Sequence, residues 1–171
     1  QGAFRHVVRQ RAMTFLDRGF PGLPSYEDHG RAVLPATIHD AIARQSPYLR
    51  AAPAAGGDSF LYWAKEQAAG KATITVSHVT LLQGDEETMP GAMAISRQVY
   101  ASHYMNGALG VTAAVPSADG ARMCLASVNR TQIDVLGGLF GGLKRTIIEG
   151  RIERETEGVF TELRRRIERN P

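Results

Sequence analysis

Two histidines in strand-like segments, His78 and His103, are candidates for acid–base catalysis or metal binding. An imidazole titrates near neutral pH and can also ligate a metal, so each is a candidate general base or ligand. If Gln83 pairs with Ala92 across a loop, His78 faces Arg97, and His103 lies six residues further on, about 20 Å away at roughly 3.3 Å per residue. That register excludes shared metal ligation, whereas another register would permit it. We therefore predict structural, hydrogen-bonded histidines, with neither a metal nor another cofactor.

Polar and aromatic side chains on the predicted strands are the candidate ligand-binding residues. Arg97 lies within an apolar segment, and a buried guanidinium must find an acceptor, either a ligand carboxylate or an internal Asp or Glu, unless the position is an exposed edge. Tyr100 and Tyr104 share one face of an extended strand, where they either line a pocket or pack in the core. The full set of candidates is His78, Arg97, Tyr100, Ser102, His103, Tyr104 and Trp63.

Known catalytic motifs are missing from the sequence. Gly137–Lys144 is glycine-rich, but its lysine does not directly follow the last glycine and no Ser or Thr follows that lysine, so it is not a phosphate-binding loop. The chain contains no Gly-x-Ser-x-Gly, no His-Glu-x-x-His and no paired cysteines. Hydrolase and zinc-site interpretations therefore lack support, and no catalytic residue is assigned.

Composition indicates one ordinary globular domain. The 171 residues are 43% hydrophobic, and 20 Lys and Arg against 17 Asp and Glu give a formal net charge of +3. This charge is too small to indicate nucleic acid or an anionic membrane as a partner. Cys124 is the single cysteine. It excludes an internal disulfide, and its place in a predicted strand indicates a buried, inert thiol.

The sequence carries no sign of a membrane anchor. No apolar run approaches the roughly 18–20 residues that span a bilayer, so we expect no transmembrane segment. The chain starts at Gln1 rather than at methionine, which is compatible with an exported or periplasmic protein that has lost a leader.

The stretch Thr73–Asn129 is typical of consecutive antiparallel strands. Asn106-Gly107 lies between two runs rich in β-branched and aromatic residues and offers two positive-φ positions, which predicts a type I′ hairpin. Side-chain alternation then sorts the hairpin into two faces. One face would hold Tyr100, Ser102 and Tyr104 against Leu109, Val111 and Ala113, and the other Val99, Ala101 and His103 against Gly110, Thr112 and Ala114.

The next connection, Pro116–Gly120, is either a two-residue Asp-Gly turn or a four-residue loop. Both alternatives place Cys124, Ala126 and Val128 on the face of Leu109. The predicted sheet is thus apolar on both faces, and it needs a cover on each face or a partner, such as a second copy in a homo-oligomer.

Flanking segments favour helices. Residues 1–58 form an N-terminal helical and loop region, with an amphipathic helix over 3–18 ending at Gly19 and a short helix beginning at Pro35. Residues 59–134 form the antiparallel sheet. Residues 138–168 form a C-terminal helix with one apolar stripe, for which the sheet is the obvious surface. We treat residues 1–171 as a single α+β domain.

The passage from the last strand into the C-terminal helix, Cys124–Arg130 followed by Gly137–Lys144, resembles the START-like, or helix-grip (SRPBCC-type), superfamily. The Leu-rich end of the helix, Thr161-Glu162-Leu163, is similar as well, and the likeness covers roughly residues 60–168. The family usually has a strand before its first helix and six after its second. Five clear strands are predicted here, and Arg31–Leu34 is a candidate for the initial one. Another antiparallel α+β fold is the alternative.

The resemblance implies a curved antiparallel sheet of five to seven strands, with N-terminal helices and a long C-terminal helix packed on the sheet. It also implies a cavity under that helix for a small hydrophobic molecule, lipid-like or polyketide-like, bound or transported without catalysis. Small residues leave room for it or permit close helix packing. The alternatives are a cyclase or isomerase using His78, His103 or Tyr100 in the same cavity, and a protein-interaction module. The small residues are Ala101, Ala108, Gly110, Ala113 and Ala114.

Overall fold

The structure, a computed structural model, describes most of the first three quarters of the chain and part of its end. The described residues are 2–28, 30–44, 57–68, 71–84, 91–102, 105–133, 158, 160–162, 164–166, 168 and 169. The chain divides into two compact units, Gln1–Ile133 and Asp134–Pro171.

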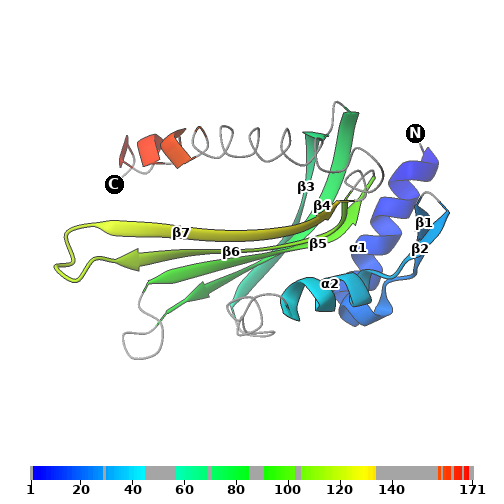
Figure 1. Cartoon of the computed structure of the whole chain (residues 1–171), viewed down its shortest axis with the longest axis horizontal. Coiled ribbons are helices and arrows are strands. Elements are labelled where there is room, and N and C mark those ends of the chain that lie inside the picture. Colours follow the sequence, from blue (N-terminus) through cyan, green and yellow to red (C-terminus); the bar gives the residue numbers. More distant parts are fainter. Residues whose placement is uncertain are drawn as a thin grey trace, which may run out of the picture. The chain divides into compact units, whose positions relative to one another are not determined.

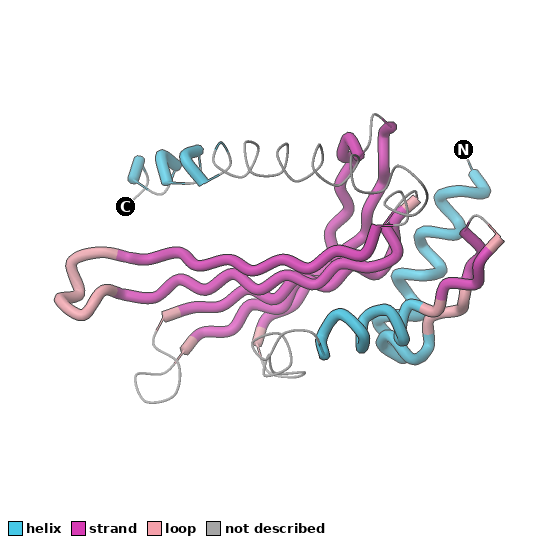
Figure 2. Tube along the Cα trace, in the orientation of Figure 1, coloured by secondary structure: helices cyan, strands magenta, loops and turns pink. Residues whose placement is uncertain are grey.

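A five-stranded antiparallel sheet forms the body of the first unit (Figure 1). Each strand lies beside its neighbour in sequence, so the order is β3-β4-β5-β6-β7, and β3 and β7 are the edges. Figure 2 shows that the sheet is curved. The α+β class and an antiparallel sheet of five strands are therefore confirmed. The strands are β3 (Asp58–Ala68), β4 (Lys71–Gln83), β5 (Ala92–Ala101), β6 (Met105–Pro116) and β7 (Met123–Ile133).

The N-terminal region supplies two helices and a small hairpin. Helix α1 (Gly2–Gly22) is kinked at Gly19, whose φ of 64° is a conformation that glycine adopts without strain. This kink confirms the predicted helix end. Strands β1 (Tyr26–Asp28) and β2 (Arg31–Val33) pair antiparallel in a separate two-stranded sheet. Helix α2 (Pro35–Arg44) begins at the proline expected in its first turn.

Both helices pack on the same face of the large sheet. Near one end, Ile42 of α2 joins a cluster that includes Ile95 and Leu109, which are 0% and 1% exposed. Near the other end, Phe15 of α1 packs with Val76, Val99 and Leu23. A sheet covered on one face by helices buries its apolar side chains there, and these two clusters form the core of the unit.

The predicted Asn106-Gly107 turn is wrong. Both residues lie within β6, where Met105 pairs with Ile133 and Gly107 with Gln132, so Asn106 is the extra residue of a bulge. An ideal Cβ on Gly107 would lie 2.7 Å from the Cγ2 of Ile38 in α2. The glycine is therefore needed for the close approach of the helix rather than for a turn.

Strand pairing between β4 and β5 agrees with the sequence, whereas the pairing between β5 and β6 does not. Gln83 pairs with Ala92 and His78 with Arg97, as expected. Between β5 and β6 the predicted pairing is displaced, because Arg97 faces Leu109. Val99 is itself an extra residue, since Val76 pairs with Tyr100 and Ser77 with Gln98. This second bulge returns Tyr100 to the face of Leu109 that the sequence indicated, and it brings Val99 into the core beneath α1, where the sequence had not placed it.

The β6–β7 connection is a six-residue loop, because Pro116 pairs with Met123. Ser117 and Asp119 organise it: the Asp119 carboxylate accepts hydrogen bonds from the Ser117 hydroxyl and from the Ala121 amide. The resulting register pairs Val111 with Val128, so the predicted face is confirmed although the loop is longer. Cys124, in contrast, is exposed, because β7 is an edge strand and its residues from Met123 to Gln132 are all exposed.

In the second unit, the described residues between 158 and 169 are helical. Arg166 pairs with Glu162 at 3.0 Å, and Arg164 pairs with Glu168 at 2.7 Å. The remainder of the predicted helix over 138–168, with its packing on the sheet, lies outside the described residues. Among the helices of the described part, none is long and apolar enough to cross a membrane.

Candidate functional site

An apolar groove of about 540 Å³ lies between α1 and the strands β3 and β4. Pockets for drug-sized ligands measure roughly 300–1,000 Å³, so the groove is large enough for a small molecule. It is open to solvent along one side, in contrast to a niche of about 10 Å³ beneath α2 that has room for no more than a water. The groove is lined by Phe4, Arg5, Val8, Arg9, Ala12, Leu61, Tyr62, Trp63, Ile74 and Val76.

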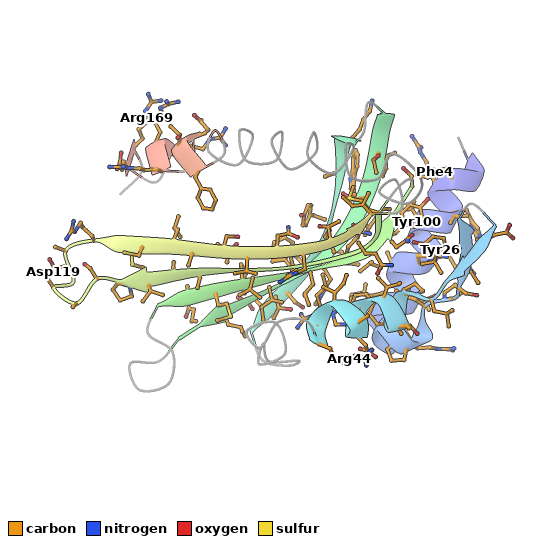
Figure 3. The ribbon with its side chains drawn as sticks, viewed as in Figure 1. Phe4, Tyr26, Arg44, Tyr100, Asp119 and Arg169 are labelled. Atoms are coloured by element: carbon orange, nitrogen blue, oxygen red, sulfur yellow. The ribbon has the colours of Figure 1, made fainter. Side chains whose placement is uncertain are left out.

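Helix α1 forms one wall because its apolar residues recur every fourth position. Phe4, Val8 and Ala12 lie one above another on the same side of the helix. Val8 also packs against the buried cluster around Phe15, which fixes the helix to the sheet. At its N-terminal end, the Phe4 ring lies 6.2 Å from the Tyr100 ring (Figure 3).

Strands β3 and β4 form the other wall. Leu61 and Trp63 alternate with residues of the opposite face, and they pair with His78 and Val76 of β4. The Trp63 side chain is 69% exposed, although it is the single tryptophan of the chain and among its largest apolar groups. An aromatic ring left in water beside a groove is available to a ligand.

Among the described residues that line the groove, two are charged, Arg5 and Arg9. They are one helical turn apart, so both lie on the groove side of α1. Neither forms a salt bridge with a residue of the described ranges. The first acidic residue along α1 is Asp17, which pairs with Arg18 at 3.0 Å. This end of the groove is therefore cationic.

Arg11 connects α1 to two aromatic residues, Tyr26 of β1 and Tyr100 of β5. Its guanidinium carbon lies 4.8 Å from the centre of the Tyr26 ring and 5.7 Å from that of Tyr100, a cation–π arrangement on both sides. Burial lowers the pKa of Arg11 and raises that of Tyr100. A guanidinium still stays protonated, so Arg11 supplies a buried positive charge that two aromatic faces accommodate.

Two histidines pack against phenylalanines, and Nδ1 of one of them, His39, also lies 3.7 Å from the Asp40 carboxylate. The His78 ring lies 5.0 Å from that of Phe15, and the His39 ring stacks on Phe20 at 4.3 Å. Burial, and then the charge of Arg97, lower the pKa of both histidines. Within the described part, Nδ1 of His78 and Nε2 of His39 are buried without a hydrogen-bond partner. His78 is thus structural through ring packing, not through the hydrogen bond that we predicted.

These histidines should make the protein less stable in mild acid. Between pH 7.5 and 5.5 the unfolded chain takes up protons around the ordinary histidine pKa of about 6.5, while His39 and His78 stay neutral in the fold because their pKa values are lowered. The unfolded state then binds more protons, so the free energy of unfolding falls as the pH falls. Urea unfolding across this range should show the decline.

Removing one of the two imidazoles tests the assignment. His78→Phe should make the decline between pH 7.5 and 5.5 shallower, while His39 keeps the remainder. A wild-type unfolding midpoint that is constant over this range would contradict the assignment.

The candidate residues from the sequence divide into three groups. Trp63 lines the groove, and Tyr100 contacts Phe4 at its end. Arg97 donates a hydrogen bond to the Thr80 hydroxyl at 3.3 Å, and the Ser102 hydroxyl accepts one from the Ile74 amide at 3.0 Å, so both make contacts within the sheet. His103 and Tyr104 lie outside the described residues.

Sequence reasoning missed the α1 wall of the site. The sequence predicts an amphipathic helix over 3–18, but none of its residues was among the candidate binding residues. Arg5 and Arg9 carried a usable signal, since two cations one turn apart without a nearby acidic residue are unusual beside an apolar stripe.

No group of His, Cys, Asp and Glu within the described ranges could hold a metal ion. Comparison with known proteins finds no match: no protein-family model, no curated protein and no solved structure is significantly similar to this chain. The geometry of the groove therefore carries the functional argument.

Proposed function

We propose that this protein binds a small hydrophobic molecule, without catalysis, in the groove between α1 and the strands β3 and β4. The observation that carries the proposal is an apolar channel of about 540 Å³ with an exposed tryptophan on its wall. The cavity expected beneath the C-terminal helix depends on residues outside the described ranges. The START-like resemblance supports lipid-like binding only as an expectation.

The expected affinity is moderate. A fully buried methylene contributes roughly 0.8 kcal/mol, so a twelve-carbon chain would gain on the order of 9 kcal/mol if all of it left water. An open groove captures part of this gain, and association costs several kcal/mol. The net gain is then well below the roughly 8.2 kcal/mol that a micromolar dissociation constant requires, so a dissociation constant weaker than micromolar follows.

Intrinsic fluorescence tests the proposal directly, because Trp63 is the single tryptophan. Titration with dodecanol below its solubility limit should shift the Trp63 emission to shorter wavelength in a saturable way, since the bound chain displaces water from the indole. An emission spectrum that stays constant, or that changes in proportion to the added alcohol without saturating, would overturn the proposal.

The alternative of a cyclase or isomerase gains no support from the described groups. His78 packs on Phe15, Tyr100 lies against Phe4 and Arg11, and no hydrogen bond joins His78 to Tyr100. Two acid–base groups converging on one point would be needed for such chemistry. His103, the third candidate, lies outside the described residues.

The exposed edge of β7 supports a second candidate function, in which two copies of the chain associate through their β7 strands. Its outer edge has no partner strand in the described part, and its residues from Met123 to Gln132 are exposed. Arg130 is the single charged residue of β7. An antiparallel pair of identical strands therefore places few like charges together, and a long edge with little charge is prone to pairing.

Val128→Lys should separate such a dimer, because a lysine on an edge strand disfavours strand pairing. Sedimentation equilibrium should show a wild-type dimer and a monomeric V128K. Val115→Lys, at an exposed position of the inner strand β6, is the matched control and should stay dimeric. A wild-type protein that is monomeric at every concentration removes this candidate.

A further inference from the structure

We propose that the molecule bound in the groove is an anionic single-chain amphiphile, with a carboxylate head group held by Arg5 and Arg9 and its hydrocarbon chain along the wall of α1. This inference rests on the proposed function and adds the charge and the orientation of the ligand. It commits to a monomeric amphiphile in solution rather than to a membrane surface.

The spacing of the two arginines suits one head group. Residues four apart on a helix are about 6 Å apart along its axis and lie on the same side. Both side chains are long enough to reach an anion placed between them. Arginine also presents a planar fork of donors, which matches the two oxygens of a carboxylate.

Nothing within the described ranges competes for these cations. Neither Arg5 nor Arg9 has a salt-bridge partner there, and the described residues that line the groove include no acidic one. In contrast, the other exposed cation of α1, Arg18, is paired with Asp17. An anion arriving at the groove would therefore meet two free guanidinium groups, whereas a cation would be repelled.

The apolar residues of the groove wall lie next to Arg5 and Arg9, and this arrangement sets the orientation of the bound amphiphile. Phe4 and Val8 each precede an arginine by one position, and Ala12 continues the stripe one turn further. Trp63 and Ile74 face this stripe from the sheet across the groove. A chain lying between these two walls keeps its head group near the N-terminal half of α1 and its methylenes on the apolar lining.

The test compares three ligands of equal chain length: dodecanoate, dodecanol and dodecyltrimethylammonium, each below its critical micelle concentration at pH 8. Isothermal titration calorimetry should rank their affinities in that order, with dodecanoate about tenfold tighter than dodecanol at low salt. The preference should weaken as salt approaches physiological strength, because the Debye length there is only about 8 Å.

Two variants separate charge recognition from chain binding. Arg5→Gln with Arg9→Gln should abolish the preference, so that the double variant binds dodecanoate and dodecanol with equal affinity. Arg18→Gln, on the same helix but outside the groove, should keep the wild-type preference. Equal wild-type affinities for dodecanoate and dodecanol, or a preference that survives the double substitution, would overturn the head-group inference and leave the proposed function standing.

Two further outcomes are informative. If none of the three ligands binds, the proposed function fails and the inference falls with it. If the protein sediments with phosphatidylglycerol vesicles but does not bind monomeric dodecanoate, the arginines act on a membrane surface and the inference is wrong.

Discussion

Replacing Leu109 with alanine should lower the free energy of unfolding by about 2–5 kcal/mol, the range for removing a buried leucine side chain from a packed core. Leu109 is 1% exposed, and it packs with Ile42 of α2 and Ile95 of β5. The cavity left behind would lie where the helix meets the sheet. Urea unfolding followed by circular dichroism measures the loss.

Leu81→Ala is the matched control, because Leu81 belongs to the same sheet but is 44% exposed. It should cost less than about 1 kcal/mol, as exposed leucines lose little burial on truncation. If L81A and L109A destabilise equally, the packing of α2 on this face of the sheet is wrong.

Trp63→Ala should weaken dodecanoate binding by about thirtyfold while leaving stability nearly unchanged. A bound chain that covers half of the indole removes roughly 100 Å² of apolar surface from water, worth on the order of 2 kcal/mol. The side chain is 69% exposed in the free protein, so its loss leaves no cavity in the core. Because the variant lacks the fluorophore, calorimetry is the measurement.

Phe60→Ala provides the control for this variant. Phe60 is also an exposed aromatic residue of β3, but it lies on the opposite face and does not line the groove. Its loss should leave dodecanoate affinity within about twofold of the wild type, since a side chain outside the site adds no ligand contact. Equal losses in W63A and F60A would indicate that the chain binds elsewhere.

Much of the fold follows from the sequence, because it is encoded locally. Pro35 and Gly19 mark helix boundaries by their backbone preferences. Of the registers left open between β4 and β5, the one that pairs Gln83 with Ala92 is present, and it places His78 opposite Arg97. The Asn106-Gly107 turn failed because a tertiary requirement, the approach of Ile38, determines the conformation of Gly107. The local sequence does not distinguish a glycine that forms a turn from a glycine that allows a helix to pack closely on a strand.

The site was harder to predict than the sheet. Trp63 and Tyr100 were identified as aromatic residues on strands, but their neighbours on α1 are far away in sequence and only the packing of that helix brings Phe4 to Tyr100. Cys124 was assigned to the interior because it lies in a predicted strand, and its exposure follows from β7 being an edge. Strand order, rather than residue type, decided that position.

The most direct test of the account is the location of a bound chain by NMR. With isotope-labelled protein and unlabelled dodecanoate, we expect intermolecular NOEs from the ligand methylenes to the Trp63 indole, the Val8 methyl groups and the Phe4 ring. Saturable binding whose NOEs fall only on residues away from the groove, such as Thr112 on the opposite face of β6, would contradict the central claim that the space between α1 and β3–β4 is the binding site.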